Sequence, residues 1–262
     1  PSEAIQNKII IDDHSTDNSR EIGIEHGWTV LTNEGYGISC AANTALKNVE
    51  TPIFCSFEQD VVISDEWFDK VYPMIFHENV VVACGVRYAS APPLIRKMEM
   101  AGHSIHLAEV SRGLRQKTNN AMGISFDNTI YRTDFVRGIG GFPYVKSGAG
   151  QDFSMFLKIC KTEKYLWEVN YNVVSQHLRP NSYINELKHQ IWYTRAIRET
   201  FLSNGFVPPS KVSTKGYLSN LVKSPLTSFK LLRVYGEPVI FFYHPAFCLK
   251  QLLGYIEGKR YA

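Results

Sequence analysis

Two pairs of carboxylates follow apolar runs of the chain and have the spacing of ligand-binding groups. The first pair, Asp12 and Asp13, stands at the end of the apolar run 8–12. Adjacent like charges raise each other's pKa unless a ligand or cation engages them. A carboxylate at this place can accept a hydrogen bond from a base N–H or a ribose hydroxyl. Helix capping accounts for the hydroxyl and amide residues that follow, but not for the pair itself.

The second pair is Glu58 and Asp60, at the end of the apolar run 52–58. In an extended chain, residues i and i+2 point to the same side, so these two carboxylates can converge on one cation. Hard oxygen ligands favour Mg²⁺ or Mn²⁺, which would bridge to phosphate oxygens. A solvated turn is the alternative for this pair alone, but two acidic strand ends in one sheet favour a shared site.

Both pairs need a framework that brings strand ends together, and the first part of the chain predicts one. Helix-like segments separate four apolar, β-rich runs, at 8–12, 28–32, 52–58 and 80–87. Strands that alternate with helices form parallel crossovers, so we expect an α/β/α sandwich with a mostly parallel central sheet. Ligands of such sheets lie beyond the carboxyl ends of the strands. Seven residues precede the first run, and we expect a first strand and helix to be missing from this chain.

The alternation stops near residue 88. Residues 88–120 form a long excursion, which we expect to cover the site. Strand signals return at 121–126 and 167–175, on either side of a predicted helix over 152–163.

Composition excludes several classes of protein. Of the 262 residues, 44% are hydrophobic and 20% are charged, which excludes disordered and low-complexity chains. The five cysteines include no CxxC pair, so we expect neither a disulfide scaffold nor a zinc ribbon. A reducing compartment, the cytoplasm, suits such cysteines best.

Five segments resemble family 2 glycosyltransferases of the GT-A (Rossmann-like) fold, in order and approximate spacing, over about residues 8–200. The resemblance implies transfer of a sugar, with inversion at the anomeric carbon, from a nucleoside diphosphate sugar to a hydroxyl of a glycan, a lipid-linked or a small-molecule acceptor. It implies a catalytic domain over 1–204, with a nucleotide-sugar half at 1–87 and an acceptor half at 88–204. The segments are IIIDDHSTDNS (9–19), NEGYGISCAANTAL (33–46), EQD (58–60), NTIYRTDFVRGIGGF (128–142) and GQDFSMFLKI (150–159).

The resemblance also implies roles for individual residues. Glu58 and Asp60 would form a DXD-like motif for Mg²⁺ or Mn²⁺, and His177 would complete the metal shell. Glu58 replaces the more usual Asp, which makes Asp60 the safer ligand, and Gln151 stands where the family usually has Glu. The implied nucleotide contacts are Asp12, Asp13, Asn33 and Gly35.

Asp152 would be the general base. The acceptor hydroxyl must lose its proton as it attacks the anomeric carbon, and a carboxylate within hydrogen-bond reach can take it. The preceding loop, Gly148-Ala149-Gly150, lets the backbone approach a substrate closely. The alternative role for Asp152 is an N-cap of the helix 152–163, and the two roles are compatible because a helix N-terminus keeps a carboxylate ionised.

Arg112 and Arg115 lie in the excursion that we expect to close over the site. Their charges could neutralise the diphosphate of the leaving nucleotide. A solvated loop is the alternative for this segment.

Residues 205–262 form a basic tail, with 8 Lys and Arg against 2 Glu, so that the net charge of +3 divides into −3 for residues 1–204 and +6 for the tail. Within it, residues 238–256 combine aromatic and aliphatic side chains, and we expect an interfacial helix, broken near Pro245, on an anionic membrane surface. Such attachment would suit a lipid-linked acceptor at the cytoplasmic face of a membrane. The alternative is a helix docked on the catalytic domain or on another subunit. No known nucleic-acid module contains this tail, so nucleic acid is not expected as a partner.

Two other functions stay open at this point. One is a non-catalytic domain that binds a nucleotide sugar. The other is a NAD(P)-dependent oxidoreductase, because Gly35 and Gly37 almost satisfy the dinucleotide fingerprint, in which Cys40 takes the place of the third glycine. The donor base and sugar, the acceptor, and the oligomeric state are not readable from these residues.

Overall fold

The computed structural model of the chain describes most of the predicted catalytic domain and two helices of the tail. The described residues are 7–89, 123–145, 148–178, 214–236 and 238–260, together with Ile5, 96–97, 100, 185, 188–189, 191–193, 195–196 and 199–200.

The N-terminal part alternates strands and helices as predicted. Strands β1 (Ile9–Asp12) and β2 (Thr29–Thr32) pair in parallel, and helix α1 (Ser19–Glu25) connects them. Gly23 lets this helix lie close to the strands, since a Cβ there would come within 2.8 Å of Val30 and 2.9 Å of Ile10. Helix α2 (Ile38–Lys47) follows. In this small unit both strands end at the same edge, and the first acidic pair lies there.

A second sheet has five strands in the order β3-β6-β5-β7-β4. Only β5 and β7 are parallel neighbours, and the other three pairings are antiparallel. The α/β class is confirmed, but this sheet is mixed rather than mostly parallel, because β6 runs opposite to both of its neighbours. The strands are β3 (Ile53–Phe57), β4 (Val61–Val62), β5 (Val80–Ala89), β6 (Asn128–Arg132) and β7 (Leu166–His177).

The strand predicted over 121–126 is wrong in position, since the strand of this region, β6, begins at Asn128. Gly123 adopts a φ of +81°, a conformation that interrupts extended backbone.

Strand β7 contains an irregularity that matters for the site. Gly85 of β5 aligns with Asn170, but the next residue, Val86, aligns with Val174, so three residues of β7 have no partner in β5. The bulged backbone lies against Gly85, where a Cβ would come within 2.8 Å of the Val173 carbonyl oxygen. Beyond the bulge, β7 continues beside β5 as far as His177.

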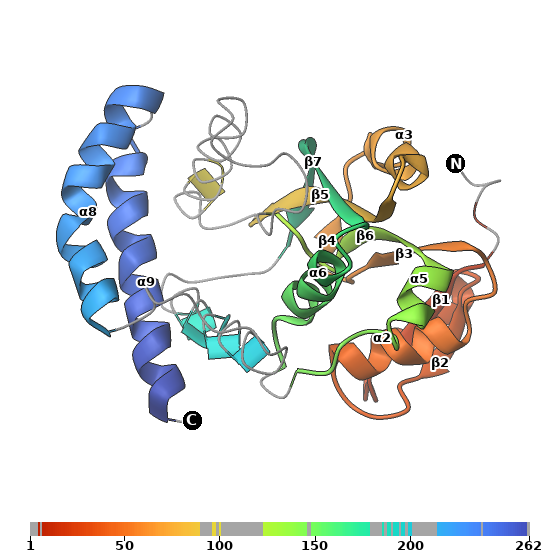
Figure 1. The fold of residues 1–262 in the computed structure, drawn as a ribbon. Helices are drawn as coiled ribbons and strands as arrows, with labels where there is room; N and C mark the ends of the chain where they lie inside the picture. Colours follow the sequence, from red (N-terminus) through yellow and green to blue (C-terminus); the bar gives the residue numbers. More distant parts are fainter. Residues whose placement is uncertain are drawn as a thin grey trace.

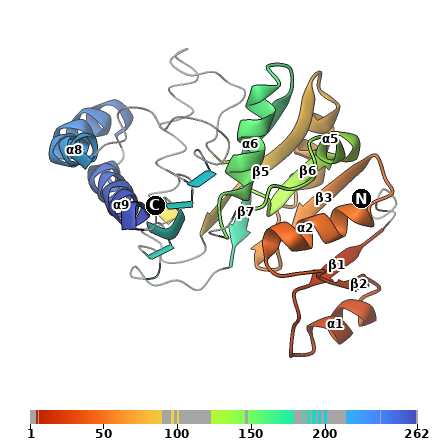
Figure 2. The same cartoon turned by 60° about the horizontal axis from the view of Figure 1, so that its bottom comes forward.

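Helices cover both faces of the five-stranded sheet (Figures 1 and 2). On one face, α2, α5 (Thr133–Gly138) and α6 (Gln151–Lys161) bury a core that includes Tyr131, Met155 and Trp167. On the other face, α3 (Trp67–Lys70) and the 3-10 helix η2 (Tyr72–Phe76) pack around Trp67 and Ile130. Adjacent residues Ile130 and Tyr131 belong to opposite cores, as the alternation of a strand requires.

The tail contains two long helices, α8 (Thr214–Tyr235) and α9 (Ile240–Arg260), which contact each other along their length (Figure 1). Helix α9 runs through Pro245, so the expected break at this residue is wrong. In α8, Pro225 cannot donate to the Leu221 carbonyl, and the Ser224 hydroxyl donates to it instead at 2.6 Å. Among the described residues, no helix is both long and apolar enough to cross a bilayer.

Candidate active site

The second acidic pair forms the turn between β3 and β4. The backbone N–H of Val61 donates to the Glu58 carbonyl at 3.2 Å, which closes the turn. Strand β4 then pairs with the end of β7, where Val61 aligns with His177, and Leu178 N donates to the Asp60 carbonyl at 2.7 Å. This pairing of two distant segments places the Asp60 side chain beside the imidazole.

Glu58, Asp60 and His177 form one cluster. A ligand atom from each of the three residues lies within 4.8 Å of the others, and His177 Nε2 is 3.0 Å from Asp60 Oδ2. The Asp60 side chain is 41% exposed and the histidine side chain 10%, so the cluster opens to solvent on the aspartate side. Two carboxylates and an imidazole are a suitable donor set for a divalent cation such as Mn²⁺. The structure thus brings together all three residues that the sequence suggested as metal ligands.

An ion pair behind this cluster was not predicted from the sequence. Arg87, near the end of β5, pairs with Asp127, whose side chain is almost fully buried just before β6. The Arg87 Nη1 lies 3.3 Å from His177 Nδ1. Oδ1 of Asp127 is buried and has no hydrogen-bond partner among the described residues. The two residues therefore connect the cluster to the interior of the sheet.

Arg87 fixes the tautomer of His177. A guanidinium only donates hydrogen bonds, so Nδ1 accepts, and the proton of a neutral ring is on Nε2, from which it points to Asp60. Ligation of a metal ion by Nε2 requires the proton on Nδ1 instead. Metal ligation and the Arg87 contact therefore exclude each other in this arrangement.

Asp152 lies in the first turn of α6 and is half-buried. Gly150, in the left-handed conformation at φ +81°, is the N-cap of this helix, so the alternative role of Asp152 as the cap is wrong. The carboxylate accepts a hydrogen bond from Phe153 N at 2.6 Å. Burial raises the pKa of Asp152 to about 6, a value close to neutral pH that suits a proton acceptor.

The carboxylates of the site influence one another. Burial raises the pKa of Glu58 to about 7, and the charges of Asp127, Asp60 and Asp152 add to this effect, while the charge of Arg87 opposes it. Burial also raises the pKa of Tyr193, and the charge of Asp152 contributes. Asp152 therefore lies near enough to the cluster for its charge to act on Glu58.

The first acidic pair contacts the turn that follows β2. The Asp13 carboxylate accepts hydrogen bonds from Asn33 Nδ2 at 2.7 Å and from Gly37 N at 3.1 Å. Asp12 is buried and pairs with Arg20 at 3.1 Å. Hydrogen bonds from Ser15 and then from Arg20 lower the pKa of Asp12.

Gly35 belongs to the same loop. Its carbonyl oxygen lies 2.9 Å from His14 Nε2, and a Cβ at this glycine would come within 2.7 Å of Cys40 Sγ. Asp12, Asp13, Asn33 and Gly35 therefore line one end of the β1–β2 unit. Arg112 and Arg115, the predicted phosphate contacts, lie outside the described residues.

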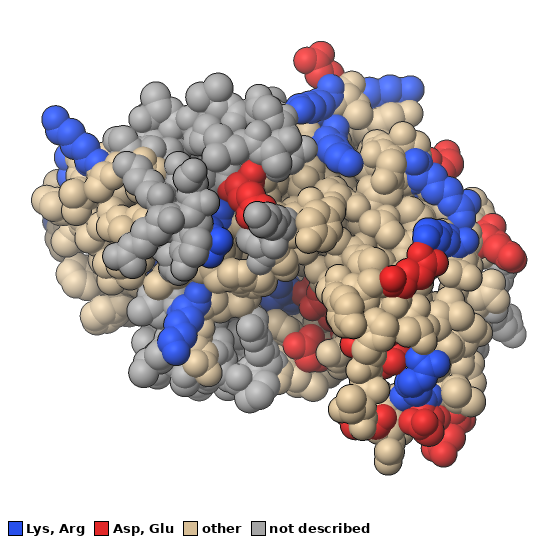
Figure 3. Space-filling view, turned by 90° about the horizontal axis from the view of Figure 1, so that it is seen from below, with Lys and Arg blue, Asp and Glu red and all other residues tan. Residues whose placement is uncertain are grey.

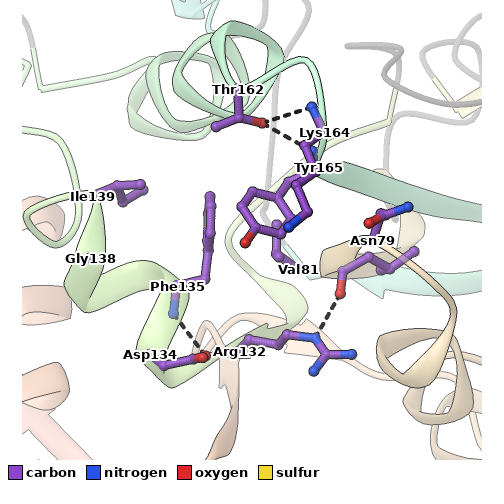
Figure 4. A pocket seen from close by; sticks show the side chains of 11 residues that line it. Asn79, Val81, Arg132, Asp134, Phe135, Gly138, Ile139, Thr162, Lys164 and Tyr165 are labelled. Carbon is purple, nitrogen blue, oxygen red and sulfur yellow. Dashed lines mark hydrogen bonds between the residues drawn. The ribbon is translucent and has the colours of Figure 1, made fainter.

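A pocket of about 560 Å³ lies at the other end of β5, and Figure 4 shows the residues around it. Its arginine, Arg132, donates to the carbonyls of Val80 and Ile75 at 2.8 and 2.7 Å. Thr162 likewise bonds to the backbone of Lys164 and Tyr165 (Figure 4). These polar groups stabilise the local fold, and none of the predicted site residues lines this pocket.

Comparison with known proteins gives the family. The sequence profile of the glycosyl transferase family 2 matches residues 7–140, more than half of the chain. The chain belongs to this family. The matched region includes β1 to β6, and with them both acidic pairs and the Arg87–Asp127 ion pair. No curated protein matches the sequence.

Solved structures show that this family 2 chain has the GT-A fold. A mannosyltransferase from Pyrobaculum calidifontis, in complex with GDP-mannose and Mn²⁺, superposes with a TM-score of 0.62 at 14% identity, over 97% of this chain and 76% of that chain. The glucosyl-3-phosphoglycerate synthase of Mycobacterium tuberculosis, with Mn²⁺, UDP and glucosyl-3-phosphoglycerate, gives a TM-score of 0.54 at 15% identity, over 78% of this chain and 71% of that chain. At these identities the likeness establishes the fold alone.

The raised pKa of Glu58 has a consequence for stability. A carboxyl group whose native pKa, about 7, exceeds its ordinary value of 4.5 binds its proton more tightly in the folded state. The metal-free family 2 domain should therefore lose about 2 kcal/mol of unfolding free energy as the pH rises from about 4.5 to 7. Thermal unfolding in EDTA at several pH values measures this loss.

Glu58→Gln is the matched variant for this measurement, because it keeps the shape of the side chain and cannot ionise. Without metal ions, we expect it to exceed the wild type in melting temperature at pH 7 and to equal it near pH 4.5. Added Mn²⁺ should reverse the order at pH 7. A variant that is less stable than the wild type in EDTA at pH 7 would contradict the assigned pKa.

Proposed function

We propose that this chain is an inverting, metal-dependent glycosyltransferase that moves a hexosyl group from a UDP-, GDP- or dTDP-sugar to a hydroxyl group. The observation that carries the proposal is the convergence of Glu58, Asp60 and His177, within 4.8 Å, in a family 2 chain whose Asp152 is near enough for its charge to act on Glu58. The nucleotides and Mn²⁺ bound by the two GT-A structures support the choice of donor and ion. The acceptor is a glycan, a lipid-linked or a small-molecule hydroxyl.

Asp60, Glu58 and His177 would hold Mg²⁺ or Mn²⁺. A bound ion would neutralise the charge that grows on the diphosphate oxygens as the bond to the sugar breaks. The Asp60 side chain is 41% exposed in this arrangement, so it would be accessible to the phosphates of the donor.

Asp152 would take the proton of the acceptor. The acceptor oxygen forms a bond to the anomeric carbon from the face opposite the diphosphate, the bond from that carbon to the phosphate oxygen breaks with its electrons, and the hydroxyl proton goes to the carboxylate. One displacement inverts the anomeric centre. The position of Asp152 at a helix start and its half-buried surroundings keep the group ionised yet basic near neutral pH.

Arg87 and Asp127 would set the basicity of this site. The charge of Arg87 lowers the pKa of Asp152, and the charge of Asp127 raises it. In the metal-free arrangement, Asp127 also keeps the guanidinium beside His177 through its ion pair with Arg87, and the contact of Arg87 with Nδ1 would be given up when Nε2 ligates a metal ion. Both residues are therefore proposed as positioning residues behind the metal ligands.

Replacement of Arg87 and replacement of Asp127 are expected to shift the pH profile of kcat/KM in opposite directions. A base must be deprotonated, so kcat/KM should fall as the pH drops through about 6. Arg87→Gln should move this acidic limb up by roughly 0.5 to 1 pH unit, and Asp127→Asn should move it down by a similar amount. Steady-state rates from pH 5 to about 8 measure both. Limbs that stay in place, or move in the same direction, would refute the assignment.

The remaining candidate site residues would bind the donor. We propose that Asp12, Asp13, Asn33 and Gly35 contact the nucleoside, and that Arg112 and Arg115 approach the phosphates. The catalytic domain would cover residues 1–204, with donor contacts mainly in 1–87 and acceptor contacts in 88–204. Five free cysteines support a cytoplasmic location for it.

A donor screen with product detection tests the proposed function. The full chain is incubated with Mn²⁺ and each UDP-, GDP- and dTDP-sugar, with and without candidate acceptors, and the anomeric configuration of the product is read by NMR. Transfer or slow donor hydrolysis by one nucleotide class is expected. Tight binding of a nucleotide sugar by calorimetry, without transfer or hydrolysis, would favour the non-catalytic binding domain instead.

A further inference from the structure

The exposed side of α8 is apolar. Leu218, Val222, Leu226 and Phe229 are 47%, 78%, 67% and 47% exposed. Successive residues of a helix advance by about 100°, so these four side chains lie within an arc of about 80°. We call them the α8 stripe, which extends along roughly 17 Å of the helix.

The side of α8 away from the stripe is its buried side, where the buried Ser224 and Ser228 lie together with half-buried apolar side chains, those of Tyr217, Leu221, Leu231 and Leu232. Ser224 and Ser228 are 1% and 0% exposed. Helix α9, which contacts α8 along its length, buries Cys248, Leu252 and Tyr255. A helix on the surface of a water-soluble domain normally buries its apolar side and exposes its polar side. Contact with α9 therefore does not explain the apolar stripe.

Basic residues lie at both ends of the stripe and along one of its edges. Helix α8 contains Lys215, Lys223, Lys230 and Arg233, and no acidic residue occurs between 214 and 235. By helical periodicity, Lys215 and Arg233 lie in the arc of the stripe at its two ends. The Arg233 guanidinium covers the Phe229 ring at 4.4 Å.

The arrangement of the molecule leaves this side accessible to a large partner. Helix α8 is the outer helix of the pair, farther from the five-stranded sheet than α9 (Figures 1 and 2). In Figure 3, acidic and basic side chains are both visible on the half of the molecule that carries the strands, whereas the charged side chains visible at the end that carries α8 and α9 are lysine or arginine. The surface around α8 is thus both apolar and positively charged.

We propose that the α8 stripe enters the headgroup boundary of an anionic lipid bilayer, with the four basic residues on the lipid headgroups. An exposed apolar stripe flanked by lysine and arginine is typical of helices that lie in this boundary. A second copy of the chain is a poorer partner, because two such faces would bring like charges together. The inference goes beyond the proposed function, and it moves the membrane contact from residues 238–256, as expected from the sequence, to α8.

Co-sedimentation of the full chain with vesicles tests the proposal. Phosphatidylcholine vesicles with and without phosphatidylserine are compared at low and high salt, in the absence of nucleotide sugar. We expect binding to the anionic vesicles at low salt and its loss at high salt. The double variant Val222→Ser/Leu226→Ser should lose this binding, and each single replacement Lys223→Gln or Lys230→Gln should weaken it about fivefold.

The control variant is Ile24→Ser, which removes an apolar side chain of similar exposure, 61%, from α1. It should bind the vesicles as the wild type does. Binding that survives the double variant, or no binding to anionic vesicles at low salt, would overturn the proposal. Self-association of the wild type that the double variant abolishes, without vesicle binding, would assign the α8 stripe to a dimer interface. None of these measurements depends on sugar transfer, so failure of the proposed function would leave them unaffected.

Discussion

Replacing Asp152 with asparagine is expected to lower kcat by about 10²- to 10⁴-fold, the range attributed to a general base. Asparagine keeps the size of the side chain and can still accept the hydrogen bond from Phe153 N, but it cannot take a proton. The affinities for the nucleotide and for Mn²⁺ should stay close to those of the wild type, because only the transition state needs the proton acceptor. Turnover numbers and calorimetric titrations of the same preparations measure the two effects.

Asp134→Asn is a matched control for this experiment. Asp134 occupies the corresponding position in the first turn of α5, and its carboxylate accepts a hydrogen bond from Phe135 N at 2.8 Å, as Asp152 does from Phe153 N. Both substitutions remove a negative charge from a helix start, but burial disfavours the charged form of Asp152 alone, so Asp152→Asn should be at least as stable as Asp134→Asn at neutral pH. Only Asp152→Asn should reduce turnover. Equal losses of activity in both variants would show that helix stability, not proton transfer, underlies the effect.

Replacing Asp60 with alanine should mainly weaken the binding of the metal ion and, through it, of the nucleotide. Removal of this solvent-accessible ligand leaves Glu58 and His177, and the loss of several kcal/mol of charge stabilisation corresponds to roughly a 10²-fold or larger fall in kcat/KM. Titration of free Mn²⁺ by electron paramagnetic resonance, with and without a nucleoside diphosphate, measures the affinity directly. Excess Mn²⁺ should restore part of the activity.

The control for Asp60 is Asp65→Ala. Asp65 is exposed and lies only five residues further along the chain, so its replacement causes the same change of net charge near the site. It should bind Mn²⁺ as the wild type does. If Asp60→Ala keeps wild-type Mn²⁺ affinity, or if Asp65→Ala loses as much, the assignment of Asp60 as a metal ligand fails.

The local sequence pattern predicted the positions of those site residues that lie at the end of a strand. Asp12, Asp13, Glu58 and Asp60 each follow an apolar run, and the runs form strands at these places. The partner of Asp60 also lies where the resemblance implied it, because β4 and β7 pair at Val61 and His177.

The direction of β6 could not be predicted in the same way. The alternation of apolar runs says that a strand exists, but not which neighbours it joins, and β6 enters between β3 and β5 in the antiparallel sense. A strand over 121–126 would end before Asp127, so the pattern does not indicate a role for this residue. In the structure, Asp127 is the polar residue directly before β6.

A feature of the sequence around Arg87 could have identified it as a site residue. It is a charged residue at the end of an otherwise apolar run, 80–87, and a cation at a strand end beside several carboxylates is a natural counter-charge. Its partners come from residues 40 and 90 positions away, so only the folded sheet could identify them.

The bulge in β7 separates the number of residues in the chain from the geometry of the metal site. Asn170 and Val174 align with the consecutive residues Gly85 and Val86, so the bulge takes up three residues that have no partner in β5 and restores the pairing beyond them. Aligned residues of parallel strands face the same side, so His177, which aligns with Ala89, lies on the side of Arg87 and reaches both Arg87 and Asp60. A homologue with more or fewer residues in the bulge would keep the histidine in place, provided that the pairing beyond the bulge is the same. When the histidine is transferred from one sequence to another, its alignment with β4 and β5 should therefore count for more than its spacing from Asn170.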